Sequence, residues 1–501
     1  MIPSISIPSL HEDLAAALDA ARAAMEPVER SRRLLELGMG SDEPIYGVNT
    51  GFGALASQTI SPDRLLELQR NLIISHAVGV GSPLPARISR LMLQLKVIAL
   101  SLGFSGVSVS TYRQLLALLD RDLIPVVPEL GSVGASGDLA PLAHLSLPLI
   151  GLGEIWGADG ATRVPAGRAL AGCGLSPVEL QAKDGLALIN GTQFMAACAA
   201  DVLHRSVDLL RTADLIAAMS LEALQGSLRP FDPRIQAVRP HPGQAVSAQN
   251  VRTLLRESQI LESHRHCGKV QDPYCLRCVP QVHGASRDAL GHAIQVTTRE
   301  LVSATDNPLV FEDGEVVSGG NFHGQPLALA IDYAKIALAE LGSISERRTY
   351  LLLEGHDGLP ALLMQETGVN SGFMIPQYTA AAMVSENKVL CHPASVDSIP
   401  TSLGQEDHVS MGSIGALHLL RVIDNVTRIL AIELFTACQA LDFRRPLRPG
   451  RGVETAHRQV RREIPFASRD RLFSADIALA IRLIEQGGLT RSLREEGIEL
   501  A

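Results

Sequence analysis

The pattern of apolar and polar residues predicts long helices in the second half of the chain. Within 412–442, apolar residues recur at spacings of four, three and four, at Leu419, Ile423, Val426 and Leu430. Such spacing places them on one face of an amphipathic α-helix, and the opposite, polar face carries Arg421, Asp424, Asn425 and Arg428. Similar long patterns run through 285–305 and 326–354. Helices of this length pack most simply as an extended bundle, so we expect a mainly α fold.

The first part of the chain has a different pattern. Before about residue 205, glycine and proline are frequent, and short helical patterns alternate with loops. We therefore predict a loop-rich N-terminal domain over 1–205 and a long-helix bundle domain over 206–501. Strand patterns are minor, and 308–318 predicts a hairpin that turns at Asp313-Gly314.

Composition and charge narrow the classes of function. The chain has 501 residues, 46% of them apolar, which is enough for a large core. Its 53 acidic and 44 basic residues give a formal charge of −9, which argues against a general affinity for nucleic acid or anionic membranes. No run of about eighteen apolar residues occurs, and the first residues lack the pattern of a secretory signal, so we expect a cytoplasmic protein.

The seven cysteines are scattered, which favours reduced thiols over a disulfide framework. One group contains residue types that bind zinc, namely His264, His266, Cys267, Cys275 and Cys278. A second Cys-x-x-Cys is absent, so we expect no metal. A zinc-stabilised helical scaffold without catalysis is the alternative from another class of function.

The most informative segment is 134–140, which reads Gly-Ala-Ser-Gly-Asp-Leu-Ala. In a sharply bent chain, the Gly137 nitrogen can attack the Ala135 carbonyl. Loss of two waters then leaves a 4-methylidene-imidazol-5-one, an electrophile whose exocyclic methylene is the former Ser136 β-carbon. Most Ala-Ser-Gly sequences are ordinary turns, so this tripeptide alone does not predict cyclisation.

Residues beside the tripeptide suit such a bend. Gly134 and Gly137 permit backbone angles that other residues rarely adopt. Asp138 stands at the N-cap position of a helix predicted to begin at Leu139. The positive end of that helix would favour negative charge on the ring.

Five parts of the sequence together resemble one family. The run 131–144 closely resembles the signature of the ammonia-lyases that carry a methylidene-imidazolone group. Further matching segments follow the order of that family, at 46–53, 190–193, 271–277 and 319–323 with 405–411. The resemblance implies a self-formed ring at Ala135, Ser136 and Gly137, with no diffusible cofactor and no metal. It also implies a homotetramer in which neighbouring subunits complete each active site.

Ammonia elimination from an amino acid requires loss of a weakly acidic β-proton and departure of a poor leaving group. The ring would assist the departure. The sequence leaves open whether the substrate's amine or its aromatic ring reacts with the methylene. Tyr46, in a glycine-rich loop, is the candidate base, although a packed tyrosine beside a turn is the ordinary interpretation of such a sequence. Because a free tyrosine has a pKa of about 10, we expect the site to lower the pKa of Tyr46.

Other candidates would bind the substrate. Arg277 offers a planar bidentate match to the substrate carboxylate, and Tyr274 lies three residues before it. Tyr274 is also the next candidate base. By resemblance, further contacts to the substrate or the ring come from Asn190, Gln271, Asn321 and Phe322.

Substrate choice is assigned to Ser75, His76 and Glu406. Ser-His is the pair found in the histidine-type members of the family, and His76 and Glu406 can both form hydrogen bonds with an imidazole. The resemblance thus implies elimination of ammonia from L-histidine to give trans-urocanate, a step of histidine degradation. A phenylalanine or tyrosine ammonia-lyase, or a 2,3-aminomutase, is the alternative. Departures from the expected motifs at 323–326 and 403–404 leave room for altered selectivity.

Overall fold

The computed structural model describes residues 3–23, 25–39, 44–266 and 268–501. The chain divides into two compact units. Unit 1 contains Met1–His204, Ala293–Asp332 and Pro393–Leu417. Unit 2 contains Arg205–His292, Tyr333–His392 and His418–Ala501. The first change of unit thus falls at residue 205, and two later segments belong to unit 1.

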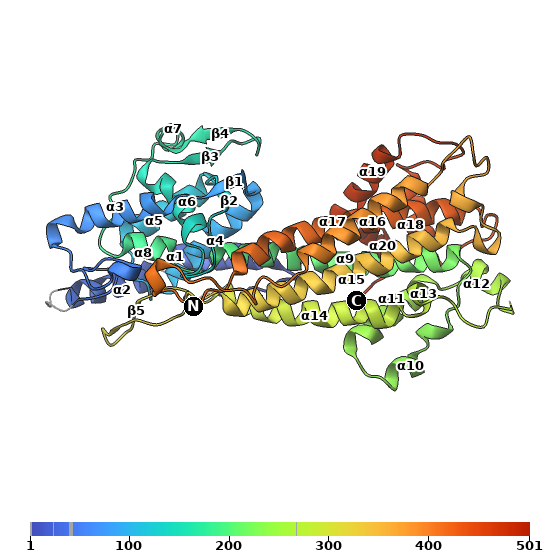
Figure 1. The fold of residues 1–501 in the computed structure, drawn as a ribbon, viewed down its shortest axis with the longest axis horizontal. Coiled ribbons are helices and arrows are strands. Elements are labelled where there is room, and N and C mark those ends of the chain that lie inside the picture. Colours follow the sequence, from blue (N-terminus) through green and yellow to red (C-terminus); the bar gives the residue numbers. More distant parts are fainter. Residues whose placement is uncertain (1–2, 24, 40–43, 267) are drawn as a thin grey trace. The chain divides into compact units, whose positions relative to one another are not determined.

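Long helices dominate the described residues, as the sequence predicted, and the mainly α fold is confirmed (Figure 1). The four longest are α9 (Gln193–Ala223), α14 (Val279–Glu300), α15 (Gln325–Leu353) and α17 (Gly412–Asp442). Each has residues in both units. No helix among the described residues is both long and apolar enough to cross a membrane.

Helix α17 is buried on more of its surface than the sequence pattern predicted. The four apolar residues of its predicted inner face are fully buried. Asn425, predicted on the polar face, is also buried, and its Nδ2 donates to Glu386 Oε2 at 2.8 Å and to Asn387 Oδ1 at 3.0 Å. Both partners lie on α16 (Met374–Leu390). Polar partners on α16 thus allow this one polar residue of α17 to be buried.

Unit 1 contains short helices and two-stranded sheets in addition to its parts of the long helices. Its helices are α1 (Leu10–Ala23), α2 (Met25–Gly38), α3 (Leu65–His76), α4 (Ala86–Ser101), α5 (Val109–Asp120), α6 (Leu139–Ser146), α7 (Ala166–Gly172) and α8 (Asp184–Ile189). Its antiparallel strand pairs are β1 (Val80–Pro83) with β2 (Pro128–Leu130), β3 (Glu154–Trp156) with β4 (Arg163–Pro165), and β5 (Leu309–Val310) with β6 (Val316–Val317). The last pair confirms the predicted hairpin.

Helix α8, which precedes Asn190, is held in unit 1 by a buried carboxylate. Asp184 accepts hydrogen bonds from Ser108 N and Oγ, both at 2.7 Å, and from Thr111 Oγ1 at 2.8 Å. Ser108 also caps α5, because its side chain accepts from Thr111 N. Burial raises the pKa of Asp184, and these hydrogen bonds oppose that rise. The start of α8 is therefore fixed against α5.

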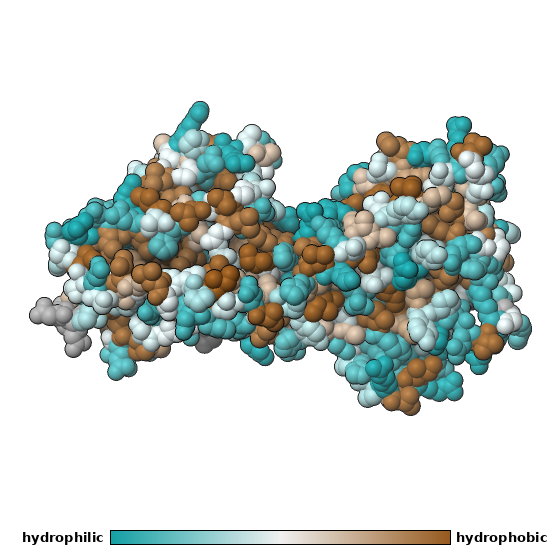
Figure 2. Space-filling model, in the orientation of Figure 1, coloured by the Kyte–Doolittle hydropathy of each residue, from teal (hydrophilic) through white to brown (hydrophobic). Residues whose placement is uncertain are grey.

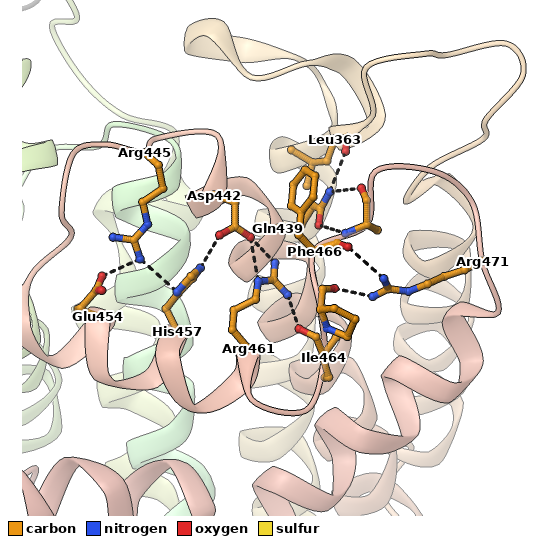
Figure 3. A network of polar contacts seen from close by, with 12 residues as sticks. Leu363, Gln439, Asp442, Arg445, Glu454, His457, Arg461, Ile464, Phe466 and Arg471 are labelled. Atoms are coloured by element: carbon orange, nitrogen blue, oxygen red, sulfur yellow. Dashed lines mark hydrogen bonds and ion pairs between the residues drawn. The ribbon is translucent and has the colours of Figure 1, made fainter.

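Unit 2 is built from the other parts of the long helices and from shorter ones. The shorter helices are α10 (Pro233–Ala237), α11 (Pro242–Leu254), α12 (Gln259–Ser263), α13 (Tyr274–Arg277), α16, α18 (Arg451–Arg461), α19 (Phe473–Glu485) and α20 (Gly488–Glu495). Phe373, Phe435 and Phe473 form an aromatic cluster with ring centroids 4.5 to 5.6 Å apart. Near the end of α17, Asp442 accepts hydrogen bonds from His457 and Arg461 on α18 (Figure 3).

Candidate active site

A cavity of about 1000 Å³ in unit 1 brings together most of the residues singled out from the sequence. Those in its wall are Tyr46, Ser75, His76, Ala135, Ser136, Asn190, Phe322 and Glu406. They come from the loop after α2, the end of α3, the loop before α6, the end of α8, and the segments before α15 and α17. Such a cavity, with apolar walls and a few polar groups, is typical of a small-molecule site.

The loop at 134–137 is tightly bent. Gly134 and Gly137 have φ angles of +68° and +74°, in the left-handed region that favours glycine. A Cβ atom at Gly137 would collide with the carbonyl oxygen of Gly191, and one at Gly134 with the Ser410 hydroxyl. Gly191 N approaches Ser136 O at 3.4 Å, and Asp138 N donates to Gly191 O at 2.7 Å. The bend is therefore held by the chain around Gly191.

Asp138 is the N-cap residue of α6, as predicted, but its side chain makes no capping bond there. Its Oδ2 instead accepts from the backbone N–H groups of Phe194 and Met195, both at 3.0 Å. These groups lie in the first turn of α9, so Asp138 ties the reactive loop to that helix. Burial raises the pKa of Asp138 to about 7, against the lowering effect of the two N–H groups and of Lys96.

Tyr46 lies in the cavity wall with its hydroxyl oxygen accepting from Gly53 N at 3.1 Å. Its pKa is raised, and not lowered as the sequence analysis expected. Burial is the main cause, the nearby Glu406 adds to it, and the hydrogen bond from Gly53 opposes both. A lowered pKa of Tyr46 would require a positive charge beside its hydroxyl. The negative charge of Glu406 raises the pKa instead.

His76 and Glu406 share the cavity with Ser136. His76 Nδ1 lies 2.8 Å from Leu72 O, one helical turn earlier on α3. Burial lowers the pKa of His76, while the Leu72 carbonyl and Glu406 oppose that effect. The Ser75 hydroxyl donates to the same carbonyl at 3.2 Å. A neutral His76 whose Nδ1 carries the proton leaves Nε2 as an acceptor.

Glu406 has a different partner on each carboxylate oxygen. Thr401 Oγ1 donates to Oε2 at 2.7 Å, and Ser136 Oγ donates to Oε1 at 3.3 Å. The backbone of Thr401 also pairs with that of Glu406. Thr401 therefore fixes the direction of the carboxylate toward the reactive loop.

Asn190 is buried at the end of α8, and its Nδ2 donates to Asp306 Oδ1 at 3.1 Å and to Asn307 O at 3.3 Å. Phe322 lies in the cavity wall. Asn321 is exposed, its Nδ2 donates to Ala304 O at 3.3 Å, and it is not among the cavity-lining residues. Its predicted contact with the ring stays a prediction.

Three other predicted site residues belong to unit 2. Gln271 and Tyr274 are exposed, and the Arg277 guanidinium lies over the Tyr274 ring at 4.5 Å from its centroid. Arg277 Nε also donates to Asp272 O at 2.9 Å. Arg277 and Tyr274, at the two ends of α13, thus form one compact group.

The candidate zinc ligands make other contacts. His264 directs Nδ1 to Ile260 O at 2.7 Å and Nε2 to Gly226 O at 3.0 Å, so both ring nitrogens are engaged by the backbone. Cys267 lies outside the described residues. Among the residues that are described, no group of three or more His, Cys, Asp or Glu side chains is close enough to hold a metal ion.

Two histidines of the cavity wall were not given a role from the sequence. His323 and His408 stack with ring centroids 6.0 Å apart and planes within 4°. Both lie in segments that carry the family resemblance, 319–323 and 405–411. This position within the motifs is the feature of the sequence that could have identified them as site residues. Their pairing was not predictable because 85 positions separate them in the sequence.

Comparison with known proteins identifies the family to which this chain belongs. The sequence profile of the family described as aromatic amino acid lyase matches residues 8–462. A histidine ammonia-lyase of Deinococcus radiodurans is 57% identical over 463 residues, which cover 92% of this chain and 88% of that protein.

Two solved structures are similar over nearly the whole chain. The crystal structure of histidine ammonia-lyase from Trypanosoma cruzi has a TM-score of 0.87 and 43% identity, and covers 94% of this chain and 89% of that one. A tyrosine aminomutase from Streptomyces globisporus has a TM-score of 0.90 and 34% identity, and covers 99% and 98% of the two chains. From the profile match and these relatives, the chain belongs to the aromatic amino acid lyase family.

Proposed function

We propose that this chain is a histidine ammonia-lyase, which converts L-histidine to trans-urocanate and ammonia. The observation that carries the proposal is that His76 and Glu406, two partners for an imidazole, share a cavity with the Ala135-Ser136-Gly137 loop. The names of relatives such as the Deinococcus radiodurans enzyme support the same substrate.

Purified protein incubated with L-histidine tests the proposal. Urocanate should accumulate, as followed by its ultraviolet absorbance and by chromatography, together with one equivalent of ammonia. Because a tyrosine aminomutase is among the similar structures, L-phenylalanine and L-tyrosine are run in parallel, with analysis for β-amino acids. Turnover of those substrates without turnover of histidine would contradict the proposal.

The loop fits a ring formed from Ala135, Ser136 and Gly137. Gly191 leaves no room for a side chain at Gly137, and Gly191 N faces the Ser136 carbonyl oxygen, which would become the ring oxygen. When formed, the ring supplies an electrophilic methylene that accepts electron density as the amine departs. The Gly191 N–H group would stabilise negative charge on the ring oxygen.

Tyr46 would take the β-proton of the substrate. The hydrogen bond from Gly53 N favours the ionised hydroxyl, whereas burial and Glu406 disfavour it. A tyrosine that is mostly protonated needs a positive group nearby to act as a base at neutral pH. In the assembled enzyme, we assign that influence to Arg277 or to the substrate ammonium.

His76 and Glu406 would bind the imidazole ring of the substrate. Neutral His76 can accept at Nε2. Glu406 Oε1 now accepts from the Ser136 hydroxyl, and the proposed cyclisation removes that hydroxyl. Ring formation would therefore free Oε1 for the imidazole N–H, while Thr401 still holds Oε2.

We propose a homotetramer in which a neighbouring subunit supplies Gln271, Tyr274 and Arg277. Large apolar side chains remain exposed on one face of α15, at Leu329, Tyr333 and Ile336. Apolar residues also appear among polar ones on the surface drawn in Figure 2. Contiguous exposed apolar side chains are typical of interfaces. A cytoplasmic location stays a prediction from the sequence.

A further inference from the structure

A buried ion pair lies directly behind Asn190. Lys183 Nζ is 2.7 Å from Asp306 Oδ2, and the side chains are 0% and 6% exposed. Lys183 Nζ also donates to Ser105 O at 2.8 Å, and Asp306 Oδ1 accepts from Asn307 N at 2.7 Å. Asp306 is therefore held on both oxygens. A buried ion pair that is held by further hydrogen bonds on both sides keeps a fixed geometry.

This fixed carboxylate determines how the Asn190 amide is oriented. Asn190 Nδ2 donates to Asp306 Oδ1 and to Asn307 O, and both are acceptors that cannot donate in return. A flipped amide would place its oxygen against a carboxylate and a carbonyl, which is unfavourable. The Asn190 oxygen is thus directed away from Asp306, is buried, and has no hydrogen-bond partner among the described residues.

The backbone shows a second sign of constraint at the same place. Lys183, which directly precedes α8, has a φ angle of +68°. Residues other than glycine rarely adopt such a backbone angle. At the other end of α8, the buried Lys96 Nζ donates to Asn190 O at 2.7 Å and to Ala187 O at 3.2 Å. Both the backbone and the side chain of Asn190 are consequently fixed by buried lysines.

We propose that Lys183 and Asp306 are positioning residues for Asn190, which lines the cavity. They orient its side-chain oxygen Oδ1 as an acceptor for the ammonium group of the substrate. A buried acceptor without a partner is costly unless a ligand satisfies it. The ammonium group is a charged donor present in every α-amino acid substrate. This inference rests on the proposed function and extends it to the recognition of the amine.

Asp306→Asn tests the inference. An amide at 306 can either accept from Asn190 or donate to it, so the fixed orientation is lost while the size is kept. Two unreactive probes separate the effects, because L-histidinol keeps the ammonium group without the carboxylate, and 3-(imidazol-4-yl)propanoate keeps the carboxylate without the ammonium group. Calorimetric titration measures the dissociation constant of each probe without requiring turnover.

In Asp306→Asn, we expect the dissociation constant of L-histidinol to rise about tenfold or more, and that of the propanoate to change by less than about twofold. Asp442→Asn makes the same chemical change in unit 2 and serves as the matched control. Because Asp306→Asn leaves Lys183 unpaired, Lys183→Met combined with Asp306→Asn is measured as well, and it decides the result if the single variant does not fold.

The possible outcomes are distinguishable. If the wild type binds both probes and the Asp306 variants lose both equally or neither, the positioning role is wrong, although the proposed function stands. A selective loss of the propanoate would mean that Asn190 recognises the carboxylate, and would also overturn the inference. If the wild type binds neither probe, the proposed function fails and the inference fails with it.

Discussion

Ser136 is the residue on which the proposed chemistry depends. Cyclisation removes one water with the Ser136 hydroxyl and a second with the Ala135 carbonyl oxygen. A peptide covering 131–145 of the folded protein should therefore show a double loss of water by mass spectrometry. Ser136→Ala should fold and keep its oligomeric state, since little volume changes, but it should lose nearly all activity. An unmodified peptide from active enzyme would contradict the mechanism.

Tyr46 should determine how the rate depends on pH. Its raised pKa means that only a small fraction of the hydroxyl is ionised at neutral pH, and this fraction grows as pH rises. We therefore expect kcat/KM to increase from neutral toward alkaline pH. Tyr46→Phe should lower kcat by orders of magnitude with a modest effect on substrate binding. If Tyr46→Phe kept most of its kcat, the base would have to be sought elsewhere, with Tyr274 as the next candidate.

Selectivity should depend on Ser75 and His76 together with Glu406. A phenyl ring would leave these groups without partners, which costs about ten- to hundredfold in selectivity for each lost contact. Wild type should therefore prefer L-histidine to L-phenylalanine and L-tyrosine. Replacement of Ser75-His76 by Phe-Leu should strongly reduce histidine turnover, as measured by kcat/KM for all three substrates. A variant that stayed selective for histidine would contradict the assignment of selectivity to these residues.

Single residues also show where sequence reasoning stops. The sequence motifs identified most of the residues that line the cavity, because each motif could be recognised from a short local stretch of sequence. The partners of Asp138 were not predictable, since they lie 56 and 57 positions away on α9. The pKa of Tyr46 is raised mainly by burial in the folded chain, and Glu406, which is far away in the sequence, adds to that rise. Protonation is set by the folded surroundings and not by the local sequence.

At the scale of elements, periodicity was a good guide to the helices. The bounds of α17 agree with the predicted segment 412–442, because a long apolar repeat has few alternative structures. The burial of Asn425 was not predictable, since it depends on Glu386 and Asn387 of α16. A polar residue in a helix indicates the exposed face only when no other element brings a polar partner.

The link between α17 and α18 should make stability sensitive to acid. Burial raises the pKa of Asp442, but His457 and Arg461 outweigh it, so the net pKa is lowered (Figure 3). The unfolded carboxyl has a pKa of about 3.9, so the stabilisation is present above that pH and is lost as pH falls further. Asp442→Asn should lower the Tm at neutral pH, and the difference from wild type should shrink below about pH 4. An equal difference at both pH values would contradict this link.

For the whole molecule, the distribution of site residues matters more than any one contact. The cavity wall, with Tyr46, Ser136 and Glu406, is formed by unit 1, whereas Tyr274 and Arg277 lie together on α13 of unit 2. Sequence motifs identify both groups but cannot say which copies of the chain combine. The resemblance to the family implies that each active site combines residues of neighbouring subunits. This combination can be tested directly.

Co-expression of two inactive variants provides that test. If each site takes Tyr46 from one subunit and Arg277 from another, Tyr46→Phe and Arg277→Ala chains in mixed tetramers should regenerate about a quarter of the wild-type sites when they mix at random. Urocanate formation by doubly tagged, purified heterotetramers measures the recovery. Tyr46→Phe combined with Ser136→Ala is the control, because both residues line one cavity of the same chain and mixing should restore nothing. Absence of recovery in stable mixed tetramers of the first pair would place Arg277 and Tyr46 of each site on the same chain.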